Sequence, residues 1–243
     1  MWLKIASNYS PNFSFPKRTK KEIKFIIIHY TGMKTESAAI NRLCNENKNV
    51  SAHYFIKSSG KVVSLVPDLY EAWHAGKSTW KKTKSLNKSS IGIEIHNPGH
   101  SHGYKSFSSK QLISLKKLLK MLIKNYKINL QNILGHSDIS PERKKDPGEK
   151  FPWKKLANSG LARWHKVSKK NLKKNRLKKL DKDEEKFFLE NLFIIGYNKI
   201  KGPNLKSNKK FIIKAFQRRF RQSLINGKSD QECFLISKNL LKT

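Results

Sequence analysis

The feature of this sequence that most limits its fold is a continuous run of apolar, mostly β-branched residues in KFIIIHY, at 24–30. A strand that is buried on both faces has this composition, because neither face carries alternating polar residues. Such strands lie at the centre of sheets that are covered on both sides. We therefore predict a central strand here, with His29 at its carboxyl end.

The segments that follow alternate between helix and strand patterns. SAAINRLC at 37–44 places apolar residues on one face of a short helix, and HYFIKSSGKVVSLV predicts a hairpin that turns at 58–60. IGIEIHN at 91–97 and QNILGH at 131–136 predict further strands, whereas the leucines of 108–126 recur at helical spacing. The sequence therefore predicts an α/β fold with a mixed central β-sheet flanked by helices.

The composition changes after Trp153, where Lys-rich helical patterns replace strand patterns. Short helices separated by Gly and Asn are expected at 184–196, 209–223 and 230–241. We therefore predict a small C-terminal three-helix domain and the following division of the chain: an α/β domain at 1–160, a basic linker at 161–182 and the helical domain at 183–243.

The charge balance is extreme, with 52 Lys and Arg against 17 Asp and Glu and a net charge of +35. Such a field attracts polyanions, among them nucleic acid, anionic membrane surfaces and cell-wall polymers. The lysines are spread through every segment, so a compositional bias of the genome explains them equally well. No nucleic-acid-binding motif is readable, and we expect no specific nucleic acid partner.

Cysteines and hydropathy exclude further classes. Cys44 and Cys233 lie far apart without the paired spacing of a thiolate zinc site, so no disulfide framework is expected. The segment 1–15 lacks the apolar stretch of a secretory signal peptide. No later run approaches the roughly 18 apolar residues that span a bilayer, so we expect no transmembrane segment.

Two histidines, His29 and His136, each follow an apolar strand pattern directly, and Asp146 comes ten residues after the second. Strand ends in a layered α/β sheet deliver side chains to one crevice. Two imidazoles and one carboxylate form a zinc site that leaves a fourth position for water, as hydrolysis requires. However, a strand-end histidine is usually structural, and eight histidines make chance pairs easy. The spacing alone therefore leaves both interpretations open.

The surrounding residues favour the zinc site. IIIHYTG, SAHYFI, WHAG, SIGIEIHNPG and GHSDISPERKKDPGEKFPW occur in this order within 26–153. They closely resemble the motif blocks of the zinc-dependent type 2 N-acetylmuramoyl-L-alanine amidases, which share their fold with peptidoglycan recognition proteins. The AmpD and AmiD branch is the most similar, because Asp rather than Cys occupies the third ligand position. The resemblance implies one Zn²⁺ per chain and hydrolysis of the amide between N-acetylmuramic acid and L-alanine.

Individual roles follow from the resemblance, position by position. It implies that His29, His136 and Asp146 are the metal ligands. Glu94 matches the family's catalytic glutamate, which takes a proton from water and passes it to the departing amine. Lys144 matches the lysine that neutralises the oxyanion together with zinc.

Other matching positions line the substrate groove or support the metal in the family: Tyr30, Tyr54, Trp73, His74 and Asn97. Core packing is the alternative for Tyr54 and Trp73, and His53 is expected to be structural. A cluster of histidines in HNPGHSHGY invites a second metal site. We instead expect these histidines to lie in a solvated Gly-rich loop, since the family has no metal ligand there. They are His96, His100 and His102.

The C-terminal segments EEKFFLENLFIIGYN, NKKFIIKAFQRRFRQ and NGKSDQECFLISKNLL resemble the three-helix peptidoglycan-binding domain that is often fused to such amidases. The chain departs from that pattern by a Lys-rich insertion, NKIKGPNLKSNKK. A binding module would raise the local enzyme concentration on an insoluble polymer. An ordinary amphipathic helix would explain AFQRRFRQ as well.

The resemblance also bears on partners and location. We expect peptidoglycan or muropeptides as the partner, a monomer, and electrostatic attraction to anionic envelope surfaces. The substrate favours the bacterial cell envelope, periplasmic or secreted, whereas the missing export signal leaves the cytoplasm open. The alternative function is a non-catalytic peptidoglycan recognition protein, against which the intact ligand set and Glu94 argue.

Overall fold

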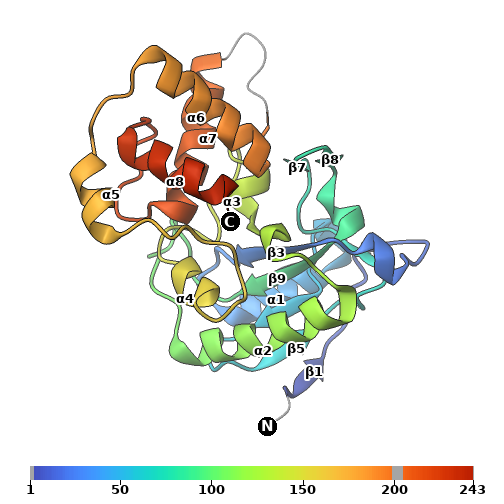
Figure 1. Ribbon diagram of the computed structural model, residues 1–243. Helices are drawn as coiled ribbons and strands as arrows, with labels where there is room; N and C mark the ends of the chain where they lie inside the picture. Colours follow the sequence, from blue (N-terminus) through green and yellow to red (C-terminus); the bar gives the residue numbers. More distant parts are fainter. Residues whose placement is uncertain (1–2, 199–204, 243) are drawn as a thin grey trace.

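The centre of the computed structural model, which describes residues 3–198 and 205–242, is a six-stranded mixed sheet with the order β1-β5-β4-β9-β3-β10. Strand β3 is parallel to both of its neighbours, β9 and β10, while β4 and β5 form the expected antiparallel hairpin. The bounds are β1 Ile5–Ser7, β3 Phe25–Tyr30, β4 Tyr54–Ile56, β5 Val62–Ser64, β9 Ser90–Ile95 and β10 Ile133–Gly135. The predicted fold class is confirmed, and β3 is an interior strand that lies between β9 and the edge strand β10 (Figure 1).

Helices surround this sheet and account for most of the C-terminal part (Figure 1). Their bounds are α1 Glu36–Cys44, α2 Ser109–Tyr126, α3 His136–Ile139, α4 Trp153–Ala157, α5 Lys169–Asn175, α6 Lys182–Ile195, α7 Leu205–Phe220 and α8 Gln231–Leu241. Two small ribbons pair β2 Phe13–Ser14 with β6 Glu71–Ala72, and β7 Thr79–Trp80 with β8 Thr83–Lys84. Short 3-10 turns occur at η1 Lys20–Glu22, η2 Glu46–Lys48, η3 Leu86–Ser89 and η4 Leu130–Asn132.

The observed elements differ from the sequence prediction mainly at their ends. The strand expected at 131–136 is shorter, because a 3-10 turn precedes it and His136 already begins α3. Part of the Lys-rich insertion, at 199–204, lies outside the described residues. Within the described ranges, no helix combines the length and apolar character needed to cross a membrane.

One face of the sheet is covered by α2. Ser108 and Gln111 form a capping box at its start, which satisfies backbone donors that a helix N-terminus leaves free. Its buried leucines pack against alternate residues of β3, Ile26 and Ile28. Because strand side chains alternate between faces, Phe25, Ile27 and His29 must point to the opposite face.

That opposite face has two separate covers. Helix α1 packs on the β4–β5 hairpin, where Leu43 belongs to the same cluster as Phe55 and Val63. The C-terminal helices pack on β3 and β10, where Ile27 shares a cluster with Phe216 of α7. His29 and Glu94 are paired residues of β3 and β9 that point to this same face, and they line a pocket there together with residues of α1.

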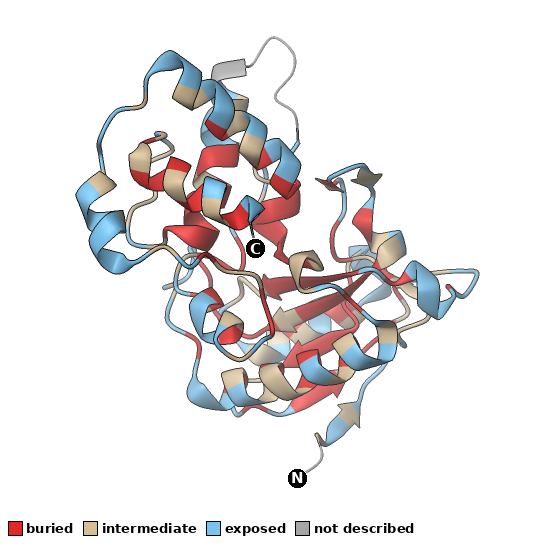
Figure 2. Cartoon of the chain, viewed as in Figure 1, coloured by how far each residue is buried: buried red, intermediate tan, exposed pale blue. Residues whose placement is uncertain are grey.

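The C-terminal helices share a buried hydrophobic cluster with residues of the sheet. Figure 2 shows buried residues along the sides of these helices that face one another and the sheet. The segment predicted as a basic linker contains α5 and the buried residues Leu161, Ala162 and His165. The division into domains stays a prediction, but the two parts share one hydrophobic cluster.

Candidate active site

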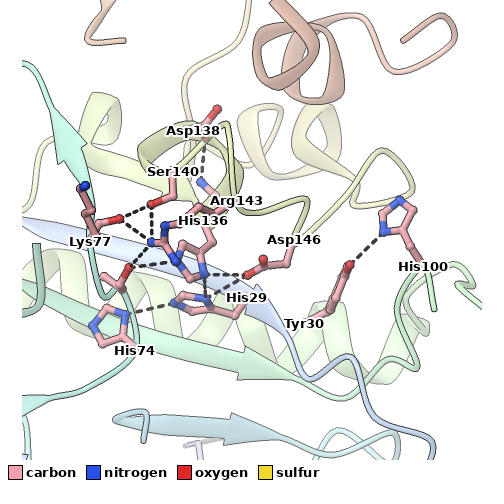
Figure 3. Close-up of polar contacts among 12 residues, drawn as sticks. His29, Tyr30, His74, Lys77, His100, His136, Asp138, Ser140, Arg143 and Asp146 are labelled. Atoms are coloured by element: carbon pink, nitrogen blue, oxygen red, sulfur yellow. Dashed lines mark hydrogen bonds and ion pairs between the residues drawn. The ribbon is translucent and has the colours of Figure 1, made fainter. Parts of the chain in front are cut away.

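Neighbouring parallel strands bring the predicted metal ligands together. His29 lies near the end of β3, and His136 directly follows the adjacent strand β10. Asp146 comes from the loop after α3 (Figure 3). The Nδ1 atoms of His29 and His136 are 2.9 Å apart, and Oδ2 of Asp146 lies 3.0 Å and 3.1 Å from them. All three side chains are buried, so few water molecules can separate their charges and dipoles.

A chain of hydrogen bonds behind His29 fixes which of its nitrogens faces the centre. The Ser90 hydroxyl donates to the carbonyl of Leu86 (2.6 Å), so its oxygen accepts from Nε2 of His74 (3.1 Å). Burial lowers the pKa of His74 well below its usual value, so its other nitrogen carries no proton. Nδ1 of His74 therefore accepts from Nε2 of His29 at 3.0 Å. Burial also lowers the pKa of His29 to about 4, which leaves a lone pair on its Nδ1.

The same reasoning holds for His136. Its Nε2 lies 3.1 Å from the carbonyl oxygen of Ala75, which can only accept, so Nε2 carries the proton. In the neutral ring, Nδ1 then presents a lone pair to the centre. Burial alone would raise the pKa of Asp146, but in the metal-free chain the hydrogen bonds and positive charge of a proton held between Asp146 and the rings of His136 and His29 outweigh it and lower this pKa. A bound cation would take the place of that proton, with Asp146 ionised.

Two imidazole lone pairs and a carboxylate oxygen thus converge on one buried point. Without a cation these atoms would repel one another, and a cation is what makes such a donor set favourable. Zinc bonds of about 2.0–2.2 Å in a tetrahedral site separate ligand atoms by about 3.3 Å, close to the distances seen here. In the described part of the chain, this is the one group of His, Cys, Asp or Glu side chains close enough to share an ion.

The convergence point lies in a pocket of about 400 Å³. Glu94 lines it from β9, directly beside His29 of β3. Burial, reinforced by the charge of Asp146, raises the pKa of Glu94 to about 8, and one of its oxygens has no hydrogen-bond partner among the described residues. Glu94 as a whole is half-buried, but a buried carboxyl oxygen without a partner destabilises the fold, which is typical of a functional group.

Basic residues of the loop after α3 form one wall of the pocket: Arg143, Lys144 and Lys145. Arg143 is held by the neighbouring loop, because its guanidinium donates to the carbonyl of Lys77 and to Ser140 Oγ. The charge of Lys144 lowers the pKa of both His29 and Glu94. Lys144 is thus close enough to the centre for its charge to act on both groups, although burial is the larger cause of each shift.

The other predicted residues fall into two groups. Tyr30 and His74 line the pocket. The hydroxyl of Tyr30 forms a hydrogen bond with Nδ1 of His100 (2.8 Å). His74 lies against Gly92 and orients His29 through a hydrogen bond. An added Cβ at Gly92 would come within 2.4 Å of the His74 ring, so only glycine leaves room for it.

The remaining predicted residues lie away from the pocket, and for Tyr54 the structure corrects the prediction. Tyr54 is buried in the cluster on the α2 face of the sheet, opposite His29. Trp73 donates from Nε1 to Ser14 Oγ (2.7 Å), outside the pocket lining. Asn97 donates to the carbonyl of Lys105 (2.7 Å) and accepts from the Gly99 amide (3.1 Å), which holds its own loop in shape.

Sequence reasoning missed His100 as a pocket residue. We expected His96, His100 and His102 in a solvated loop; His100 and His102 are exposed as expected, whereas His96 is buried at 7% exposure. The exposed ring of His100 nevertheless stacks on Tyr104 with centroids 4.4 Å apart and lies 3.1 Å from Glu149. It also lines the pocket beside Tyr30. No short-range pattern could have shown this, because Tyr30 is 70 residues away in sequence. His53 is structural as expected, since it accepts from the Gly92 amide and contacts the Tyr70 carbonyl, each at 3.0 Å.

The fold and the site define a class of protein, an α/β enzyme whose buried centre could hold one metal ion. Within that class, the chain belongs to the N-acetylmuramoyl-L-alanine amidase family, whose model matches residues 19–149.

Individual relatives agree. The chain is 35% identical over 232 residues to the N-acetylmuramoyl-L-alanine amidase AmiD of Escherichia coli K12, covering 90% of this chain and 83% of that protein. It is 38% identical over 111 residues to the 1,6-anhydro-N-acetylmuramyl-L-alanine amidase AmpD of Haemophilus influenzae, covering 45% of this chain and 58% of that protein. The solved complex of E. coli AmiD with the substrate anhydro-N-acetylmuramic acid-L-Ala-D-γ-Glu-L-Lys superimposes with a TM-score of 0.81 at 33% identity, covering 91% and 89% of the two chains.

Proposed function

We propose that this chain hydrolyses the amide bond between the lactyl group of N-acetylmuramic acid and the L-alanine of the stem peptide, with one Zn²⁺ held by His29, His136 and Asp146. The observation that carries the proposal is the convergence of two imidazole nitrogens and one carboxylate oxygen within 2.9–3.1 Å of each other. Two nitrogens and one oxygen from three residues, with a fourth position open to the pocket, form the donor set of a catalytic zinc site.

Zinc bound there would polarise the scissile carbonyl and make a water molecule more acidic. Glu94 accepts one proton from the water while the water oxygen attacks the carbonyl carbon. The raised pKa of Glu94, about 8, suits a group that takes and returns a proton near neutral pH. The negative charge that develops on the carbonyl oxygen faces Lys144. Glu94 then gives this proton to the nitrogen of L-alanine and the C–N bond breaks. The second proton of the attacking water passes to the departing amine, so a lactyl carboxylate and the ammonium form of L-alanine are the products.

The names and bound substrates of the relatives support the substrate class. The solved AmiD complex holds an anhydro-muropeptide, and the AmpD relative is named for 1,6-anhydro-N-acetylmuramyl-L-alanine. Arg42, Lys144 and Lys145 line the pocket and suit the carboxylates of a stem peptide. We therefore assign peptidoglycan or its anhydro-muropeptide fragments as substrate, in cell-wall turnover at the bacterial envelope. The C-terminal helices are assigned to peptidoglycan binding on resemblance, and we expect a monomer.

The test incubates the purified chain with sacculi and with soluble anhydro-muropeptides and identifies the products by mass spectrometry. The chain should release stem peptide, lose this activity with a chelator and regain it with Zn²⁺. If the His29→Ala and Glu94→Ala variants digest as fast as the parent, the proposal fails.

A further inference from the structure

The C-terminal helices contact the α/β part of the chain directly behind the candidate metal centre. Tyr197, just after α6, and Arg219 of α7 both reach Asp138, which lies on α3 two residues after the ligand His136. Gly196 packs so closely on Trp80 of β7 that an added Cβ would lie 2.3 Å from its ring. The docking is therefore tight at the helix that carries a metal ligand.

The Asp138 carboxylate is fully engaged and shielded from water, at 1% exposure. Its Oδ2 accepts from the amide of Gly135 (2.8 Å) and from Nη1 of Arg219 (2.6 Å). Its Oδ1 accepts from the hydroxyl of Tyr197 (2.8 Å). Two of these three donors come from the C-terminal helical part, and a buried carboxylate that lost them would remain charged without compensation.

Arg219 also holds the strand that leads into α3. Its Nη2 donates to the carbonyl of Ile133 in β10 (2.9 Å), and its guanidinium carbon lies 4.3 Å from the centre of the Trp153 ring. Arg219 is 3% exposed, so these contacts are not screened by solvent. One side chain thus fixes β10, α3 and α4 relative to one another.

The backbone of α3 couples these contacts to the ligands. The Ser137 amide donates to the carbonyl of Asp146 (2.8 Å), and the Ser140 amide donates to the carbonyl of His136 (3.0 Å). Figure 3 shows Asp138 on the far side of His136 from His29, so the helix is held from behind while its ligand faces the centre. A tilt of α3 would therefore move His136 relative to both His29 and Asp146.

We propose that Arg219 and Tyr197 are positioning residues for His136, so that docking of the C-terminal helices and metal binding are thermodynamically coupled. Coupling of this kind is reciprocal: docked helices raise the affinity for metal, and bound metal stabilises the docked helices. The C-terminal helices then support the centre directly, in addition to any role in binding polymer. The inference rests on the proposed function only in taking His136 as a metal ligand.

The test compares matched substitutions in the full-length chain. Arg219→Met removes the contacts to Asp138, while Arg221→Met removes an equally buried arginine that pairs with Asp230 inside the C-terminal helical part. Tyr197→Phe removes only a hydroxyl. Its control, Tyr126→Phe, removes a bond to Asp68 (2.7 Å) on the α2 side of the sheet.

The readouts are the Zn²⁺ dissociation constant, from competition with a chromophoric chelator, and the visible absorption spectrum of the Co²⁺-substituted protein. We expect Arg219→Met to weaken Zn²⁺ binding by about 10–100-fold, as loss of groups that orient ligands does elsewhere. Tyr197→Phe should weaken it by about fivefold. Both should change the Co²⁺ spectrum and lower kcat with KM unchanged, whereas both controls should stay within about twofold of the parent in Zn²⁺ affinity.

The proposal is overturned if Arg219→Met and Arg221→Met lower the melting temperature alike while both keep the parental Zn²⁺ affinity and Co²⁺ spectrum. If Arg219→Met does not fold, Tyr197→Phe decides, and parental metal binding in that variant overturns the proposal. A parent that binds Zn²⁺ but releases no stem peptide refutes the proposed function alone. A parent that binds no Zn²⁺ refutes both.

Discussion

Replacing Glu94 by Gln should lower activity and raise stability at the same time. Glutamine keeps the size of the side chain but cannot carry a proton between water and the departing amine, so kcat should fall by about 10²–10⁴-fold. The stability gain follows from the pKa of Glu94, about 8 in the folded chain against the ordinary 4.5. The folded state therefore binds this proton more tightly than the unfolded state does.

The sign of the pH dependence follows from linkage. Between pH 4.5 and about 8 the unfolded state loses the proton first, so the metal-free parent loses stability as the pH rises through this window. The full difference in pKa corresponds to an upper bound of about 4–5 kcal/mol. Local relaxation and entry of water reduce the cost of a buried charge, so we expect metal-free Glu94→Gln to be more stable than the parent by about 2 kcal/mol at pH 8.

Differential scanning calorimetry with a chelator present measures this difference at pH 5 and pH 8. The gain should be small at pH 5 and amount to several degrees at pH 8, since about 2–4 °C corresponds to 1 kcal/mol in a chain of this size. Glu142→Gln, in the exposed part of the loop after α3, is the control and should show no such difference. The reasoning is refuted if Glu94→Gln melts with the parent at pH 8, or if it keeps parental kcat.

Three further substitutions test other parts of the site. Gly92→Ala should displace the His74 ring and destabilise the chain by about 1–3 kcal/mol, together with weaker Zn²⁺ binding; a parental denaturation midpoint would contradict the close contact. Lys144→Ala should lower kcat by about 10²–10³-fold, whereas Lys145→Ala should change kcat little. Equal losses of kcat in the two variants, measured in steady-state assays, would show that any positive charge on this loop stabilises the transition state and that Lys144 has no special role. Tyr54→Phe removes a hydrogen bond to Asp68 and should lower the free energy of unfolding by about 1 kcal/mol, with kcat/KM unchanged. A large loss of kcat/KM would indicate that Tyr54 contacts the substrate after all.

The sequence predicted the frame of the fold because the relevant patterns are local. The run at 25–28 has only one stable environment, a strand covered on both faces, and the leucines of α2 have one helical face. The motif order then placed His29, His136 and Asp146 in one site, and their ligand atoms lie within 3.1 Å of each other.

Tertiary structure decided the rest, because the deciding contacts join segments that are far apart in sequence. Every residue of Tyr54–Ile56 is buried, so the sequence pattern could not show which face of the sheet each side chain occupies. Tyr54 points away from the site, whereas Phe55 lies on the same face of the sheet as the site. Ser90 acts through His74 to decide which ring nitrogen of His29 faces the metal centre. The place of His100 beside the pocket depends on its hydrogen bond with Tyr30.

The docking of the C-terminal helices is a further feature that the sequence could not show. Sequence alone predicted that they form and separated them from the α/β part, because composition changes sharply after Trp153. Only the folded chain shows Arg219 buried against Asp138, 81 residues away, where an ion pair removed from water ties the two parts together. Local sequence patterns determine which helices and strands form and which side chains can bind a metal. The packing of distant elements determines how those side chains are oriented, because the contacts that orient them come from residues far away in the sequence.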